Sequence, residues 1–183
     1  MLNLQNLDEE TRGQMLAEID LDVAESRLYV SDRLLASAAT AYPTTLKEAA
    51  EFHDDEWLAE RLRQLGFRAT ETYMRDGEAR ERKVPSNAAD VLAEGEFNRF
   101  YARGLCLRVL ASGGHELVIY RAKTAVKPRP ESEAKLGSRI IAEELLHDLR
   151  VHIAIDTALG VPAGPNSGLS VMLPENQAEL SPT

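Results

Sequence analysis

Two groups of residues have spacings that occur in metal sites. Glu144 and His147 form an E-x-x-H pair, the spacing that places two metal ligands on one face of a helix in helical bundles. Such a site needs matching ligands from other helices, and the sequence has no second E-x-x-H pair. His53 lies among carboxylates in "EFHDDEW", but exposed acidic clusters without a shaped loop rarely bind divalent ions. The sequence therefore predicts no metal site and no bound cofactor.

Arg121 and Lys123 lie two positions apart in "ELVIYRAK", the segment with the strongest strand character. Metal-dependent nucleases of the PD-(D/E)XK type have an acidic metal ligand two positions before a strand lysine. Arg121 occupies that position here, so a cation replaces the metal ligand. The two side chains share a strand face and could contact a phosphate or a carboxylate, and we interpret them as members of surface salt bridges.

Nucleophilic catalysis has no signature in the sequence. There is no G-x-S-x-G elbow, and "GPNSGLS" lacks the lysine and following helix with which a glycine-rich loop binds phosphates. Cys106 is the only cysteine and lies in a strongly helical stretch, so we interpret it as a buried, unreactive residue. We predict no catalytic residues and no enzymatic activity, and an unrecognised metal-dependent enzyme remains the alternative.

The composition is typical of a folded protein with one domain. The chain has 183 residues, 44% of them hydrophobic and 28% charged, which is enough to bury a core. No apolar run approaches the about 18 residues needed to cross a bilayer. The first residues have neither the basic nor the apolar segment of a signal peptide. We therefore expect a cytoplasmic location and no membrane partner.

Charge is distributed in three blocks along the chain. Residues 1–60 carry 14 acidic and 4 basic side chains, residues 61–130 carry 8 and 14, and residues 131–183 carry 8 and 3. These blocks could neutralise one another when the chain folds. Alternatively, an acidic surface of one copy could meet a basic surface of the next, because complementary charge steers association.

The first third of the chain is predicted to be mostly helical. Asp8 is a suitable N-cap for a helix over about 8–24. Alternation in residues 27–31 favours a short strand. Pro43 is expected in the first turn of a second helix, and a third helix should end at Gly66.

A long central helix should begin after Asn87, because its apolar residues form one broad stripe. Gly95 and Gly104 would each cost about 1 kcal/mol inside that helix, so we expect another backbone to pack closely against them. Helical spacing from Leu136 toward Gly160 predicts a further helix of some 25 residues.

Arg99 and Arg103 lie one turn apart on the central helix, away from its apolar line. Buried arginines usually pair with carboxylates. We interpret the two as part of a structural network, with Glu131 and Glu133 as candidate partners; a ligand site is the alternative.

A β-hairpin is predicted over about 68–84. Two polar alternating runs are joined by Asp76-Gly77, the pair that supplies the positive φ angles of a type I′ turn. Neither run has a strong apolar face, so the hairpin should project from the body. Its cations should lie in solvent, where they would contact nucleic acid or an acidic protein surface, or only water. These cations are Arg75, Arg80, Arg82 and Lys83.

The last residues, 161–183, are predicted to form an extended arm. Prolines stiffen the backbone and remove donors, which disfavours a phosphate-binding nest. "GLSVML" predicts one short strand that could add to a sheet of its own body or of another chain. We expect the arm after Gly160 to contact another subunit. The candidate interaction residues in it are Leu169, Val171 and Leu173.

Several segments resemble a set of small proteins encoded by tailed phages and prophages. They are "LAEGEFNRFYARGLCLRVL", "YRAK", "PRPESEAKLG" and "LGVPAGPNSGLSVML", within residues 90–173. The resemblance implies a role in the virion or its assembly, at the capsid, the neck or the connector. It implies no catalytic residues.

Together these observations favour an α+β fold, mostly helical, with a small antiparallel sheet, the projecting hairpin and the C-terminal arm. Residues 1–160 would form the single domain. The expected function is a phage structural or assembly protein that binds copies of itself and other virion proteins, located in the virion and assembled in the host cytoplasm. The alternative is a nucleic-acid-binding protein that uses the basic region 61–130.

Overall fold

The structure is a computed structural model that describes residues 1–124, 128–153 and 168–174. The fold is α+β, as the sequence predicted. Six helices, a two-stranded hairpin and a three-stranded antiparallel sheet make up the described part of the chain. Among those residues, none of the helices is long and apolar enough to span a lipid bilayer.

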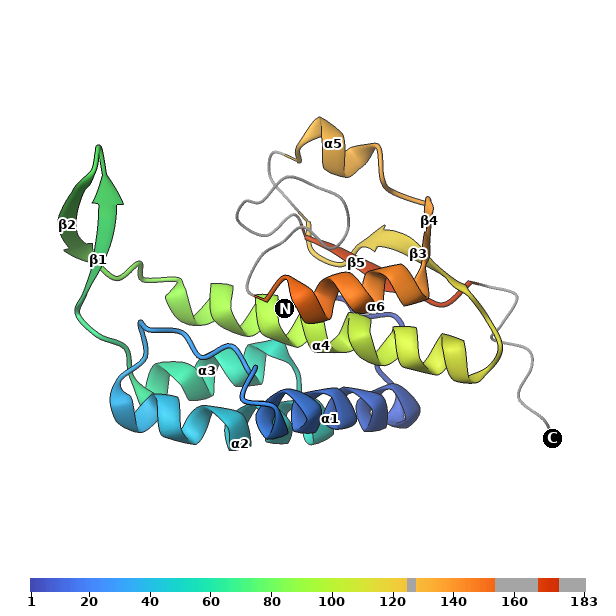
Figure 1. The fold of residues 1–183 in the computed structure, drawn as a ribbon, viewed down its shortest axis with the longest axis horizontal. Coiled ribbons are helices and arrows are strands. Elements are labelled where there is room, and N and C mark those ends of the chain that lie inside the picture. Colours follow the sequence, from blue (N-terminus) through green and yellow to red (C-terminus); the bar gives the residue numbers. More distant parts are fainter. Residues whose placement is uncertain (125–127, 154–167, 175–183) are drawn as a thin grey trace.

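Three helices form the first layer. α1 (Glu9–Ala24) begins at Asp8, whose carboxylate accepts the Thr11 backbone N–H at 3.0 Å, as predicted. α2 (Ala36–Phe52) and α3 (Asp55–Leu65) follow, and α3 ends at Gly66 with φ 102°. The three-stranded sheet and α6 (Ala142–Val151) lie on the opposite side of the long helix α4 (Ala88–Ala111) from this layer (Figure 1).

Two local predictions in this layer were wrong. Residues 27–31 form a loop rather than a strand, because the Arg27 and Leu28 N–H groups donate to the Asp22 carbonyl at the end of α1. Pro43 lies inside α2 rather than in its first turn. The alanine-rich turns before it are helical already, and Ala38 and Tyr42 are buried in the core.

The central helix, α4 (Ala88–Ala111), contacts α1, α3, α6 and the sheet. It is buried around most of its circumference, which confirms its predicted position. Gly104 is where α1 approaches: a Cβ there would lie 3.0 Å from the Thr11 carbonyl oxygen. The same expectation for Gly95 was wrong, since a Cβ there would meet nothing within 4 Å.

The three-stranded sheet has the order β4-β3-β5. Its middle strand β3 (Glu116–Arg121) is the predicted strand, two residues shorter. Antiparallel partners on its two sides are β4 (Arg139–Ile141) and β5 (Leu169–Met172). The short helix α5 (Pro130–Glu133) lies between β3 and β4 in the chain.

The helix expected from Leu136 to Gly160 was wrong in its first part. Gly137 adopts φ 76°, residues 139–141 pair with β3, and α6 (Ala142–Val151) begins only after them. The backbone groups of these residues bond to the edge of β3 in place of the bonds that a helix would form. Residues 154–160 of the expected helix lie outside the described residues.

The strand predicted in the C-terminal arm docks on its own body. β5 pairs with β3 in the register Val118↔Met172 to Arg121↔Leu169. Leu169 and Val171 are buried in the core and Leu173 is packed against it. These three residues therefore stabilise this domain, and part of the expected arm belongs to the sheet; the remainder, 161–167 and 175–183, is not among the described residues.

Candidate interaction surface

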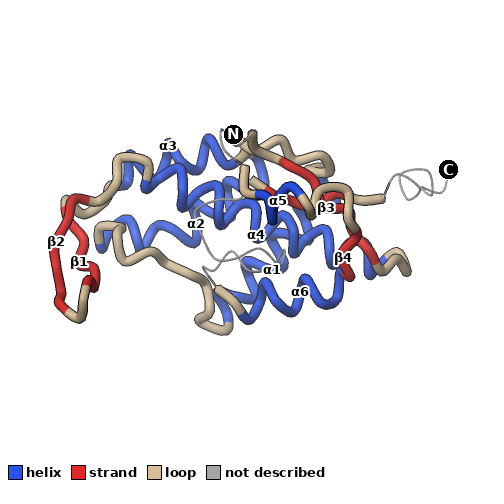
Figure 2. The backbone as a smooth tube through the Cα atoms, turned by 90° about the horizontal axis from the view of Figure 1, so that it is seen from above, coloured by secondary structure: helices blue, strands red, loops and turns tan. Residues whose placement is uncertain are grey.

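The hairpin of β1 (Thr70–Arg75) and β2 (Glu78–Lys83) projects beyond the ends of the helices (Figures 1 and 2). Asp76 and Gly77 have φ angles of 54° and 81°, the positive values that a type I′ turn requires. The strands pair in the register Thr70↔Lys83 to Arg75↔Glu78. In the described part of the chain no third strand joins them.

Glu71 holds the base of the hairpin. Its carboxylate accepts from Arg33 Nε at 2.5 Å and from Arg82 Nε at 2.6 Å. The hydrogen bond from Arg33 is the largest cause that lowers the pKa of Glu71, with Arg82 adding to it. The Arg82 guanidinium also lies 4.8 Å from the centre of the Tyr73 ring. One face of β1 is thereby covered by arginines, while the other face is open.

The four predicted hairpin cations do not form a positive surface. Residues 70–83 contain four acidic and four basic side chains, so the hairpin carries no net charge. Arg75 lies 3.6 Å from Asp76 and Arg80 lies 3.3 Å from Glu78. Lys83 is exposed at the end of β2. The surface alternates in charge rather than being basic.

Arg121 and Lys123 form ion pairs, as interpreted from the sequence. Arg121 pairs with Glu133 and Lys123 pairs with Glu94. The contacts join the sheet to α5 and to α4, so these two cations hold elements of one domain together.

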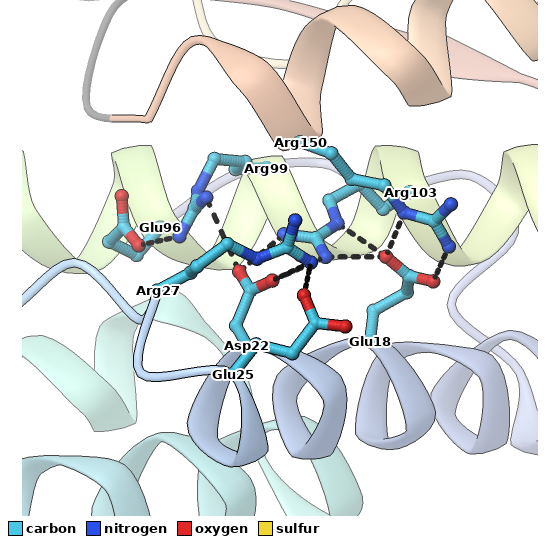
Figure 3. A network of polar contacts seen from close by, with 8 residues as sticks. All are labelled: Glu18, Asp22, Glu25, Arg27, Glu96, Arg99, Arg103 and Arg150. Atoms are coloured by element: carbon cyan, nitrogen blue, oxygen red, sulfur yellow. Dashed lines mark hydrogen bonds and ion pairs between the residues drawn. The ribbon is translucent and has the colours of Figure 1, made fainter.

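A buried charge network lies between α1, α4 and α6 (Figure 3). Arg103, which is 0% exposed, donates from Nε to Glu18 at 2.6 Å and from Nη1 and Nη2 to Asp22 at 2.6 and 2.9 Å. Arg150 also donates to Glu18, and Arg99 donates to Glu96 at 2.5 Å. The structural role expected of Arg99 and Arg103 agrees with these contacts.

The expected partners of Arg99 and Arg103 were wrong. Glu133 pairs with Arg121 instead, and the carboxylates that pair with the two arginines come from α1 and from α4 itself. Burial works to raise the pKa of Glu18, but the hydrogen bonds and charges of Arg150 and Arg103 outweigh it and hold that pKa below its usual value. Burial raises the pKa of Glu96 despite its pair with Arg99.

A hollow of about 670 Å³ opens between the first residues and the turn from α2 to α3. His53 stacks on Trp57 there, with ring centres 4.1 Å apart, and Phe52 is exposed beside them. Burial raises the pKa of Asp55, whose oxygens accept the Leu2 N–H at 3.0 and 3.1 Å. Asp55 thus fastens the N-terminal segment.

Among the described residues, no further ligand joins Glu144 and His147, the pair with metal-site spacing. Glu144 and His147 are both exposed on α6. Within the described ranges, no group of three His, Cys, Asp or Glu side chains is arranged to hold a metal ion. Cys106 is fully buried, and burial raises the pKa of its thiol to about 12.

Asn98 is a polar residue that sequence reasoning missed. Its amide donates to the Leu169 carbonyl at 2.9 Å and accepts from the Ser170 hydroxyl at 2.6 Å. It thereby satisfies buried groups of β5, and only the position of that strand on α4 makes this role visible.

No protein-family model, curated protein or solved structure matches this chain.

Proposed function

We propose that this chain is a structural or assembly protein that acts through protein–protein contacts, with the β1–β2 hairpin as its contact element. One observation carries the proposal: the hairpin packs chiefly on itself, and every residue of β2 is exposed. A two-stranded hairpin alone is marginally stable in water and needs a third strand or a packing surface. In the described residues its own body supplies no third strand and contacts the hairpin at its base, through Arg33 and Glu71, so a neighbouring chain is the natural source of the rest.

The charge of the hairpin favours a protein partner over nucleic acid. Binding to the phosphate backbone depends on cations that are free to neutralise phosphates. Here four carboxylates balance four cations, and Arg75, Arg80 and Arg82 each have an acidic neighbour. Alternating charge suits a protein surface of complementary pattern.

The resemblance to tailed-phage proteins supports a virion as the assembly, at the capsid, the neck or the connector. The partners would be further copies of the chain and other virion proteins, and the location would be the virion, assembled in the host cytoplasm.

Light scattering tests the proposal. The purified chain should have a native mass that is a multiple of its 20.2 kDa subunit. A variant in which a short Gly-Ser linker replaces residues 70–83 should have the mass of one subunit and unchanged helical circular dichroism, because the hairpin packs chiefly on itself. A wild-type mass of 20.2 kDa at every concentration would overturn the proposal.

DNA chromatography separates the alternative. Retention at low salt that is lost in an R80A/R82A/K83A variant would favour nucleic-acid binding. We expect the chain not to be retained.

A further inference from the structure

The backbone groups of β1 face alternately toward β2 and toward solvent. At the base of the hairpin the Val84 N–H donates to the Ala69 carbonyl at 3.1 Å. Hydrogen-bonded and non-hydrogen-bonded pairs alternate along antiparallel strands. Glu71 and Tyr73 therefore bond to β2, while the backbone groups of Thr72 and Met74 point outward, and no other described segment bonds to them.

The two edges of the hairpin differ in how well they can pair with a further strand. β2 has five charged residues out of six, in "EARERK", and a charged edge discourages strand addition. β1 reads "TETYMR" and exposes the side chain of Met74 by 68%. Threonine, tyrosine and methionine fit a paired strand better, so β1 is the edge open to addition.

We propose that β1 pairs antiparallel with β1 of a second copy, with Tyr73 opposite Tyr73 on the twofold axis. This inference rests on the proposed function and names its first partner. The two hairpins become one four-stranded sheet, which supplies the strands that each hairpin lacks. The contact is isologous, with the same surface used by both copies.

Charge selects this register among the symmetric ones. Centred on Tyr73, the pairing sets Glu71 opposite Arg75 of the second copy, twice. Because β1 and β2 pair Glu71 with Arg82 and Arg75 with Glu78, charge then alternates across all four strands. A register centred on Glu71 or on Arg75 would place like charges opposite each other, which destabilises a sheet.

The remaining symmetric registers lack this complementarity. Centring on Thr72 sets Glu71 opposite Tyr73, and centring on Met74 sets Arg75 opposite Tyr73. Neither brings opposite charges together. The Tyr73 register also places Thr72 opposite Met74, so that their outward backbone groups bond to each other in both halves of the sheet.

Disulfide trapping tests the register. In Tyr73→Cys, the two new thiols would face each other across a closely spaced pair, so oxidation should yield a covalent dimer on a non-reducing gel. The native Cys106 does not compete, because it is fully buried. Arg80→Cys is the matched control: it lies opposite Tyr73 on β2, about 14 Å from its counterpart in the four-stranded sheet, and should stay monomeric on the gel.

Proline substitution tests the edge without oxidation. Thr72→Pro removes an outward N–H and keeps the bonds to β2, so the native mass should fall to one subunit. Glu81→Pro makes the same change on the β2 edge and should leave the mass unchanged.

The outcomes separate this inference from the proposed function. The β1 pairing alone is overturned if Arg80→Cys crosslinks as readily as Tyr73→Cys. It is also overturned if neither variant crosslinks although light scattering shows that the wild-type chain associates through the hairpin. A wild-type chain with the mass of one subunit at all concentrations overturns both.

Discussion

Arg103→Ala tests the buried charge network. The substitution removes three hydrogen bonds at 2.6–2.9 Å and leaves Asp22, which is 2% exposed, without a cation that hydrogen-bonds to it. The nearest remaining nitrogens, of Arg27 and Arg99, lie 3.6 and 3.7 Å from its oxygens. Breaking a buried pair from one side costs about 3–5 kcal/mol. Because Arg27 and Arg99 still compensate part of the Asp22 charge, we expect a loss of about 3 kcal/mol, the lower end of that range, in the free energy of unfolding.

Urea denaturation at pH 7 measures this loss, and the m-value should stay unchanged if both states keep their compactness. Arg150→Ala is the control. The side chain of Arg150 is 31% exposed, and without it Glu18 keeps its bond from Arg103, so that loss should be about 1 kcal/mol or less. If Arg103→Ala costs no more than Arg150→Ala, the network does not stabilise the helix packing as argued.

Two further expectations concern the helix packing and acid stability. Gly104→Ala forces a methyl group to 3.0 Å from the Thr11 carbonyl oxygen and should lower the free energy of unfolding, measured with urea, by about 1–3 kcal/mol. In the control Gly95→Ala the methyl group meets no neighbour, and the free energy of unfolding should rise by up to about 1 kcal/mol. Equal effects of the two substitutions would refute the close approach of α1 to Gly104. Because the folded pKa of Glu18 is lowered from 4.5, its contribution is complete above that value and is lost as pH falls through the folded pKa. The urea concentration at the midpoint of unfolding should therefore decrease when the pH falls below about 4.5, and it should decrease less in Glu18→Gln. An equal decrease in the variant would contradict this contribution of Glu18.

Local signals in the sequence were sufficient for several elements. Asp76-Gly77 determines the turn between β1 and β2, because few other pairs accept two positive φ angles. Asp8 and Gly66 mark helix ends through their own backbone and side-chain geometry. The central place of α4 followed from an apolar surface too wide for a helix with one solvent face.

Two of the failures have their cause in long-range contacts. Residues 139–141 continue a helical apolar pattern, yet they pair with β3, which the local pattern cannot show. The partners of Arg103 lie 81 and 85 positions away, on α1. The sequence indicated that the arginine needs carboxylates, but tertiary packing decides which ones.

For the hairpin, the sequence indicated exposure but not its balance of charge in space. The basic residues were correctly placed in solvent, while their pairing with Glu71, Asp76 and Glu78 became clear only from the strand register. That register also revealed which backbone groups of β1 face outward.

Hydrogen exchange at the backbone amides of Thr72 and Met74 tests most directly whether another chain completes the hairpin. We expect both amides to be protected at protein concentrations where the native mass is that of an oligomer, and to exchange rapidly after dilution to single subunits. Rapid exchange of both amides at every concentration would contradict the account.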